Sequence, residues 1–155
     1  MDRARHGALP CQPREGPAVE VLARLIISYT DVDVWEVEYT DQFGDWYENL
    51  SEEDQDAVIA RVELLEQTGP VLGRPAVDNV HQSKHSNMKE LRAEGSLRVL
   101  FAFDPRRTAI LLIGGDKSPD DPGSPNWNRW YDHYVPIADD LYDTHLRELN
   151  EEGLI

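Results

Sequence analysis

The apolar and polar positions in the first half of the chain predict one strand followed by a helical hairpin over 41–68. Residues 34–39 (VWEVEY) alternate apolar and polar side chains, which is typical of a half-buried strand. Aromatic residues then recur at helical spacing within 41–49. The serine and acidic residues of 51–54 indicate the capped start of a second helix, which Gly69-Pro70 ends. The apolar stripe of that helix consists of Val58, Ile59, Val62 and Leu65.

The second half of the chain predicts three strands that lie side by side. The candidate strands cover residues 87–92, 97–103 and 108–114. The links between them, at 95–96 and 105–107, are short and contain Gly, Ser, Pro and Arg. Because such short links suit hairpins, we expect the three strands to be antiparallel neighbours.

A predicted helix closes the chain and begins near Pro136, because proline is favoured in the first helical turn. The element order is therefore β-α-α-β-β-β-α. This order predicts an α+β fold, with a small antiparallel-rich sheet and helices packed on one of its faces. The packing face of the last helix consists of Ile137, Leu141, Tyr142, His145 and Leu149.

Glycine and proline mark the segments that lie outside these elements. Residues 1–18 are predicted to be disordered, and 118–128 a mobile loop, because both are rich in these two residue types. Residues 70–87 are predicted to be a connector. We therefore expect a disordered or extension segment over 1–30 and one domain over 31–150.

Composition narrows the class of protein. A chain of 155 residues suits one domain, and its single cysteine, Cys11, excludes an intrachain disulfide and fits a reducing compartment. No apolar run reaches the roughly 18 residues of a membrane span, and no apolar segment follows the N-terminal arginines as in a secretion signal. We expect a cytoplasmic protein that does not bind a membrane and needs no cofactor.

Charge is distributed unevenly along the chain. The formal net charge of −15 argues against nucleic-acid binding. Residues 81–117, however, hold seven Lys or Arg against four Asp or Glu, a balance of +3, so the rest of the chain carries −18. Because physiological salt screens charges beyond about 8 Å, a local basic face can bind an anion despite an acidic far side. An RNA backbone is the candidate anion.

Four cations form the candidate anion site: Lys89, Arg92, Arg98 and Lys117. A guanidinium holds two phosphate oxygens at once, and this contact strengthens as negative charge builds. Lys89 and Arg92 face opposite ways in a regular strand, so they share a site only if a bulge or twist intervenes. Ordinary surface ion pairs are the alternative for the two arginines, and a solvated side chain is the alternative for Lys89.

Lys117 follows Gly114-Gly115-Asp116 at the end of the last strand. Glycine lets a backbone approach a ligand closely, so a phosphate-binding or general-acid role is one interpretation of this lysine. A turn lysine paired with Asp116 is the other interpretation.

Two further candidates follow the predicted mobile loop. Tyr131 could stack on a base or pass a proton, and His133 could act as an acid or base near neutral pH. Packing is the alternative for both, as it is for their aromatic neighbours Trp127, Trp130 and Tyr134.

His81 and His85 are four residues apart but lack a third metal ligand at suitable spacing. We therefore predict no metal site. His85 is kept as a minor candidate for the RNA-binding face.

Residues 34–149 resemble the RelE/ParE superfamily of bacterial toxins, and most closely its HigB-like, phage-derived branch. The resemblance covers about three quarters of the chain and excludes its first 30 residues. It is carried by WYENL at 46–50, MKELR at 88–92, RVLFAFDP at 98–105, AILLIGGDK at 109–117 and WY at 130–131.

The resemblance implies a small sheet flanked by helices and a metal-independent ribonuclease that cuts mRNA, commonly on the ribosome. It also implies a neutralising helix-turn-helix antitoxin as partner. Arg98 stands where the superfamily often has a phosphate-binding arginine, and the position of Lys117 is commonly basic. Two alternatives stay open: a ParE-like gyrase inhibitor that lacks enzyme activity, and a degenerate toxin-fold protein.

Overall fold

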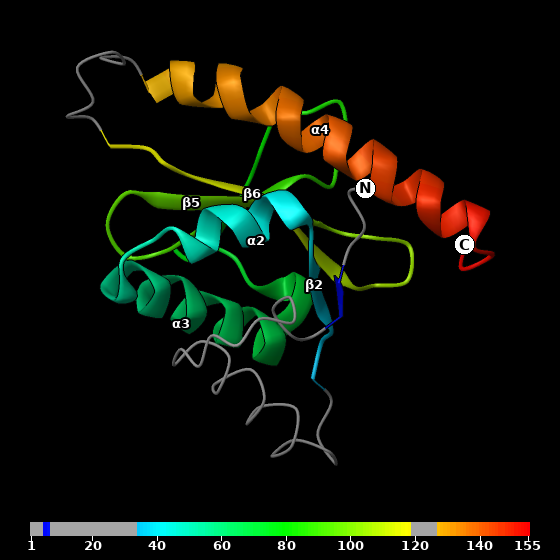
Figure 1. Cartoon of the computed structure of the whole chain (residues 1–155), viewed down its shortest axis with the longest axis horizontal. Coiled ribbons are helices and arrows are strands. Elements are labelled where there is room, and N and C mark those ends of the chain that lie inside the picture. Colours follow the sequence, from blue (N-terminus) through cyan, green and yellow to red (C-terminus); the bar gives the residue numbers. More distant parts are fainter. Residues whose placement is uncertain (1–4, 7–33, 119–126) are drawn as a thin grey trace.

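The computed structural model describes residues 5–6, 34–118 and 127–155, and within them forms one mixed sheet with three α-helices (Figure 1). The sheet order is β1-β2-β6-β5-β4-β3. The strands are β1 Arg5–His6, β2 Val37–Tyr39, β3 Val77–Asn79, β4 Lys89–Arg92, β5 Leu97–Phe103 and β6 Ala109–Asp116. The helices are α2 Asp41–Glu48, α3 Glu52–Thr68, the 3-10 turn η1 Gly69–Val71, and α4 Trp127–Glu151.

The strand pairing confirms the predicted α+β class and the antiparallel-rich sheet. β3, β4, β5 and β6 are antiparallel neighbours in that order, and only the β2–β6 pair is parallel among the described strands. The three predicted strands are therefore adjacent, as their short links require. β1 and β3 were not expected, because the connector at 70–87 and the first residues carry no strand pattern of useful length.

The helices cover both faces of the sheet, so the prediction that they share one face is wrong. Val99, Phe101 and Leu111 face a core that they share with α2 and α3. Leu100, Ala102 and Ile110 face a second core, which α4 covers. Figure 1 shows α4 on the far side of the sheet from the α2–α3 hairpin. β5 and β6 are buried on both sides, which explains why their sequences are continuous apolar runs.

The hairpin of α2 and α3 confirms its sequence signals. Ser51 Oγ accepts a hydrogen bond of 3.1 Å from the Asp54 backbone N–H, which is the N-cap that the sequence predicts. The stripe residues of α3 are buried in the hairpin-side core. Gly69 ends the helix at φ 72°, and a Cβ there would lie 2.2 Å from the Trp35 indole. The glycine is therefore required both by the backbone angle and by the packing of Trp35.

The last helix begins at Trp127, nine residues before the predicted start at Pro136. Pro136 lies inside α4 on its exposed side, where water can solvate the carbonyl that loses its backbone partner. Of the predicted packing face, Leu141, Tyr142, His145 and Leu149 are buried and Ile137 is half-buried. Most of the predicted mobile loop, and most of the N-terminal extension, lie outside the described residues.

Candidate functional site

The ends of β4, β5 and β6 bring the predicted arginines together on the face that α4 covers. Arg92 is paired directly with Arg98, and Arg98 is paired with Gly115 on the other side. Directly paired residues have Cβ atoms about 4.5–5.5 Å apart, and like charges at such a pair are destabilising. Two arginines facing each other across a hairpin therefore indicate a site that is built to hold negative charge.

A buried carboxylate, Glu90, stands beside these arginines. Its side chain lies on the same face of β4 as Arg92, and the residue is only 1% exposed. The Tyr131 hydroxyl donates to Glu90 Oε1 at 2.7 Å, and Arg92 Nε donates to Oε2 at 2.8 Å. Tyr131 comes from the first turns of α4, 41 residues away in sequence.

Lys117 joins the same group through Tyr131. Its Nζ lies 2.6 Å from the Tyr131 hydroxyl oxygen, which therefore contacts both an ammonium and a carboxylate. Burial, together with the nearby charges of Arg98 and Arg92, lowers the pKa of Lys117, although Glu90 opposes this shift. We call the five residues Glu90, Arg92, Arg98, Lys117 and Tyr131 the Glu90 cluster.

Arg98 has both a structural contact and unused hydrogen-bonding capacity. Its Nη1 donates to the backbone carbonyls of the β4–β5 turn, at 3.0 Å to Gly95 and 2.8 Å to Leu97. Its Nε is buried and has no hydrogen-bond partner. Burial lowers the pKa of this guanidinium, and the Arg92 charge adds to that shift. A buried donor without an acceptor is uncommon in folded proteins and indicates a place where an acceptor can bind.

The glycines before Lys117 serve packing rather than ligand approach. A Cβ on Gly114 would lie 2.2 Å from the Trp46 ring, on the hairpin side of the sheet. A Cβ on Gly115 would lie 2.9 Å from Tyr134 and 3.1 Å from Trp130, on the α4 side. Aromatic rings thus fill the space on the hairpin side of Gly114 and on the α4 side of Gly115. The groups that approach this backbone closely are the protein's own side chains and not a ligand.

Two predicted site residues lie outside the Glu90 cluster. Lys89 is paired with Phe101 on the opposite face of the sheet, and its Nζ donates to Asn79 Oδ1 at 3.2 Å. β4 runs without the bulge that would bring Lys89 to the side of Arg92. His133 is exposed on α4, two residues after Tyr131, and contacts the Tyr134 ring. Two residues turn a helix by about 200°, which directs His133 away from the sheet.

The predicted alternatives for the cations have mixed outcomes. Asp116 accepts a hydrogen bond of 2.5 Å from Ser96 Oγ, and Lys117 Nζ contacts the Tyr131 hydroxyl. Arg92 does form ion pairs, with Glu90 at 2.8 Å and with Asp78 at 3.3 Å. The hydrogen bond to Glu90 is the main cause of the raised pKa of Arg92.

Glu90 is the functional candidate that the sequence reasoning missed. It was counted only as one of four acidic residues in a basic segment. The signal lay in the strand alternation, because a period of two places Glu90 and Arg92 on one face of β4 and Lys89 on the other. A carboxylate flanked by Met88 and Leu91, both buried, also requires a specific partner.

A second ionic group occupies the other end of β5, and we call Glu38, Asp104, Arg106 and His145 the Asp104 cluster. Asp104 Oδ2 accepts from Arg106 Nη2 at 2.8 Å and contacts His145 Nε2 at 2.9 Å. Asp104 Oδ1 accepts from the backbone N–H groups of Arg106 and Thr108. Arg106 also donates to Glu38, at 2.9 Å from Nη2. The contacts within the turn fix its shape, and those to Glu38 and His145 hold it against β2 and α4.

His85, a minor candidate for the RNA-binding face, is held against the second half of α4. Its Nε2 lies 2.7 Å from Asp143 Oδ1, and its ring contacts Tyr142 edge to face. Asp143 is 12 residues after Tyr131 on α4, which is about 18 Å along the helix. His85 therefore lies apart from the Glu90 cluster.

The described residues form neither a metal site nor a helix that could span a membrane. No group of three His, Cys, Asp or Glu side chains in this part of the chain is arranged to hold a metal ion. No helix among the same residues combines the length and the apolar character that crossing a membrane demands.

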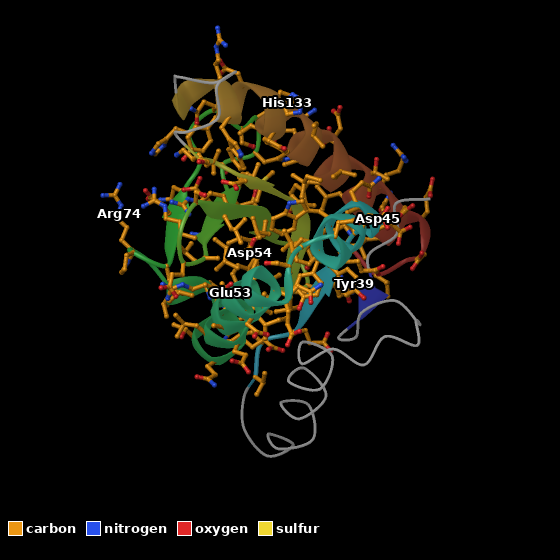
Figure 2. All side chains as sticks on the ribbon, turned by 60° about the vertical axis from the view of Figure 1, so that its left-hand side comes forward. Tyr39, Asp45, Glu53, Asp54, Arg74 and His133 are labelled. Carbon is orange, nitrogen blue, oxygen red and sulfur yellow. The ribbon has the colours of Figure 1, made fainter. Side chains whose placement is uncertain are left out.

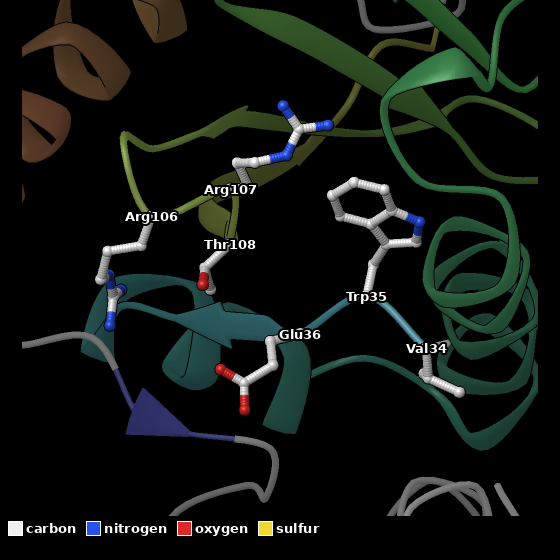
Figure 3. A pocket seen from close by; sticks show the side chains of 6 residues that line it. All are labelled: Val34, Trp35, Glu36, Arg106, Arg107 and Thr108. Carbon is white, nitrogen blue, oxygen red and sulfur yellow. The ribbon is translucent and has the colours of Figure 1, made fainter. Parts of the chain in front are cut away.

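A pocket of about 390 Å³ lies away from the Glu90 cluster (Figure 3). In it the Arg107 guanidinium lies over the Trp35 ring, 5.1 Å from the ring centroid. Its lining residues are Val34, Trp35, Glu36, Arg106, Arg107 and Thr108.

A dense group of acidic residues lies on the opposite side of the sheet from the Glu90 cluster, although α4, on the same side as the cluster, also carries six Asp or Glu against two Arg. Residues 41–68, the α2–α3 hairpin, contain nine Asp or Glu and one Arg. Figure 2 shows Asp45, Glu53 and Asp54 on this hairpin and His133 on α4. The sheet separates the hairpin from the arginines, so the local cations are compatible with a strongly anionic chain.

Comparison with known proteins identifies the family. The sequence profile described as "Phage derived protein Gp49-like (DUF891)" matches residues 45–143, a range that contains the whole Glu90 cluster. The chain belongs to this Gp49-like family. This result confirms the resemblance to the HigB-like, phage-derived branch of toxins.

Two relatives of this Gp49-like protein come from Mycobacterium tuberculosis. One, named "Putative toxin HigB3", is 53% identical over 95 residues, covering 61% of this chain and 78% of the relative. The other, named "Putative toxin HigB2", is 41% identical over 110 residues, covering 68% of this chain and 52% of the relative. The chain thus spans about half of the second relative's length. No solved structure matches the chain significantly.

Proposed function

We propose that this Gp49-like protein is the toxin of a toxin–antitoxin pair and acts as a metal-independent endoribonuclease on mRNA. One observation carries the proposal. A carboxylate that is 1% exposed, Glu90, is bonded to a phenol and lies among three cations, Arg92, Arg98 and Lys117. RNA cleavage without a metal requires these types of group: a base, donors for a developing oxyanion, and an acid.

Glu90 is suited to be the general base. In RNA cleavage the 2′-hydroxyl attacks the adjacent phosphate and must lose its proton. An ionised carboxylate has about four lone-pair sites, and the hydrogen bonds from Tyr131 and Arg92 use two of them. Glu90 can therefore accept the proton while both contacts hold its orientation. A positioned base of this kind contributes about 10²–10⁴-fold to a rate.

Arg92, Arg98 and Lys117 are suited to the charge that develops at the phosphate. The transition state carries more negative charge than bound RNA, so guanidinium donors stabilise it selectively. Arg98 Nε is a buried donor that still lacks an acceptor. Lys117, with its pKa lowered by burial and neighbouring cations, can donate a proton to the leaving 5′-oxygen.

The proposed partners follow from this activity and from the toxin names of the relatives. They are mRNA, with cleavage on the ribosome in the cytoplasm, and a helix-turn-helix antitoxin that neutralises the protein. A ParE-like gyrase inhibitor is the competing function. A protein-binding toxin does not need a buried carboxylate among three cations, so the Glu90 cluster favours the nuclease.

The decisive experiment uses the full chain with two substrates: an RNA oligonucleotide in excess EDTA, and mRNA on purified ribosomes in the magnesium buffer that keeps them assembled. We expect fragments that end in a 2′,3′-cyclic phosphate and begin with a 5′-hydroxyl. Glu90→Gln keeps the shape of the side chain and removes the base, so cleavage should fall about 10²–10⁴-fold. Glu94→Gln, on the exposed β4–β5 turn, is the matched control.

Two results would contradict the proposal. One is intact RNA in both substrates, together with inhibition of gyrase in a supercoiling assay. The other is full cleavage by Glu90→Gln.

A further inference from the structure

Glu90 is poorly connected to solvent for a residue that must release a proton in every reaction cycle. Its side chain is 1% exposed without RNA, so proton exchange with bulk water is slow once the product has left. Arg92 Nε occupies one carboxylate oxygen, and a guanidinium has donors but no acceptor. Among the described contacts, the Tyr131 hydroxyl is the neighbour that can accept a proton from Glu90.

The Tyr131 hydroxyl is also in contact with the proposed acid. Its oxygen lies 2.7 Å from Glu90 Oε1 and 2.6 Å from Lys117 Nζ, so one hydroxyl joins both ends of the acid–base pair. We propose that Tyr131 relays a proton from Glu90 to Lys117 after each cleavage and thereby resets the site. This inference rests on the proposed ribonuclease function.

The protons taken up and released over one reaction cycle balance without another reactant. During cleavage Glu90 takes the proton of the 2′-hydroxyl, and Lys117 gives a proton to the 5′-oxygen. The site is then left with a neutral carboxylic acid and a neutral amine. Glu90 next passes its proton to the Tyr131 oxygen while the Tyr131 O–H proton passes to Lys117 Nζ. The carboxylate and the ammonium are restored, and Tyr131 ends as it began.

The electrostatics of the site favour a neutral Tyr131 throughout the proton transfer. Burial, followed by the hydrogen bond and charge of Glu90, raises the pKa of Tyr131 above its usual value. The phenolate is therefore disfavoured, and the two proton transfers must occur together. Burial and the neighbouring arginines lower the pKa of Lys117, so a neutral amine can exist briefly after cleavage.

Packing keeps the relay atoms at hydrogen-bonding distance. Tyr131 meets Trp130 edge to face at 5.4 Å, and Trp130 stacks on Tyr134 at 4.6 Å. Both Trp130 and Tyr134 lie against Gly115 of β6, two residues before Lys117. The start of α4 is thus fixed to the strand that carries the proposed acid.

The test compares wild type and Tyr131→Phe on one RNA oligonucleotide under two regimes. With enzyme in excess, a single cleavage needs no reset, so any loss in that regime measures only how the Tyr131 hydroxyl orients Glu90. With substrate in excess, each round needs a reset, and we expect kcat of the variant to fall by about a further tenfold or more. An external proton carrier should restore that kcat, so rising imidazole concentration should accelerate the variant and leave wild type unchanged. These changes are of the size that removing a positioned proton-transfer group produces.

Tyr134→Phe is the matched control, because it removes a hydroxyl from the neighbouring helix position outside the Glu90 cluster. Thermal melting of all three proteins checks that each is folded. An equal loss in both regimes, without imidazole rescue, would show that Tyr131 only positions its neighbours and would overturn the relay. A higher KM with unchanged kcat would show base stacking and overturn it too. If wild type cleaves no RNA, the ribonuclease proposal fails and the relay with it.

Discussion

The two ends of β5 carry ionic groups of similar composition. Hydrogen-bond acceptors suffice for the donors in the Asp104 cluster, whereas donors are in excess in the Glu90 cluster. Each has a buried carboxylate, an arginine beside it and one side chain from α4. In the Asp104 cluster, two carboxylates share Arg106, and Asp104 accepts from side chains and backbone. In the Glu90 cluster, three cations surround one carboxylate, and Arg98 Nε has no acceptor.

The difference teaches that burial and charge alone do not identify a site. Asp104 and Glu90 are both nearly inaccessible, at 4% and 1% exposed. What separates the clusters is the supply of acceptors for their donors. A cluster with its donors satisfied holds elements together, whereas one with excess donors can bind an anion. Along β5, Asp104 is six residues, about 20 Å, from Arg98 and four residues, about 13 Å, from Leu100, the partner of Glu90. Each cluster can therefore be altered without touching the other.

The largest expected effect on stability is at Asp104. Asp104→Asn removes the charge that faces Arg106 and His145 in the interior, and breaking such a buried group costs about 3–5 kcal/mol. Urea unfolding measures the loss. Cleavage per folded molecule should stay at the wild-type level. A stable variant without activity would reverse the roles of the two clusters.

A large effect on activity is expected from Arg92→Ala, with Lys89→Ala as its matched control. The residues lie on the same strand but on opposite faces, and only Arg92 contacts Glu90. Cleavage should fall about 10²-fold or more for Arg92→Ala, the scale seen when a donor to a developing oxyanion is lost. Lys89→Ala should cleave RNA at nearly the wild-type rate. Equal losses in both variants would place RNA across both faces of the sheet.

An intermediate effect is expected from Gly115→Ala. The new Cβ would lie 2.9 Å from Tyr134, so the start of α4 must shift, at a cost of about 1–3 kcal/mol. The shift should separate Tyr131 from Glu90 and reduce turnover, while the Asp104 cluster at the other end of α4 keeps its contacts. Gly73→Ala, where a Cβ meets nothing within 4 Å, is the control. Urea unfolding and RNA cleavage are measured for both variants. Wild-type stability and turnover in Gly115→Ala would contradict the prediction.

The smallest effect is a pH dependence confined to the Asp104 cluster. Burial alone would raise the pKa of Asp104, but the hydrogen bonds from His145, Arg106 and the Thr108 backbone lower it below 3.8 overall. A carboxylate with a lowered folded pKa stabilises the fold above pH 3.8 and loses this contribution as pH falls through the folded value. Each pKa unit corresponds to about 1.4 kcal/mol. The stability gap between wild type and Asp104→Asn should therefore narrow in urea titrations below pH 3.8, and a constant gap would contradict this assignment.

The sequence predicted the local structure well where the residues that form a feature lie close together in the chain. The Ser51 cap, the Gly69 stop and the short links between β4, β5 and β6 each depend on residues that are near one another in the chain. The same locality explains the errors. The helix was predicted to start at Pro136, nine residues too late, because its earlier turns are held by residues of another element. Trp130, for example, packs against Gly115 of β6.

The candidate site was predicted in part. Arg92, Arg98 and Lys117 lie close together because strand order and register follow from short hairpins. Lys89 was kept as a candidate, but it lies on the other face of the sheet, as the alternation along β4 requires. Glu90 was overlooked because its role depends on Tyr131, 41 residues later.

The sequence by itself determined the α2–α3 hairpin, the antiparallel neighbours β4, β5 and β6 and the positions of the cations along them, since these depend on periodicity, caps and turns within short segments. Only the tertiary structure decided that α4 covers the second sheet face. That placement brings Tyr131 to one end of the sheet and His145 to the other, 14 residues or about 21 Å apart along one helix. The physical reason is that polar groups become partners when distant elements pack their apolar faces together. No local pattern in the sequence specifies that packing.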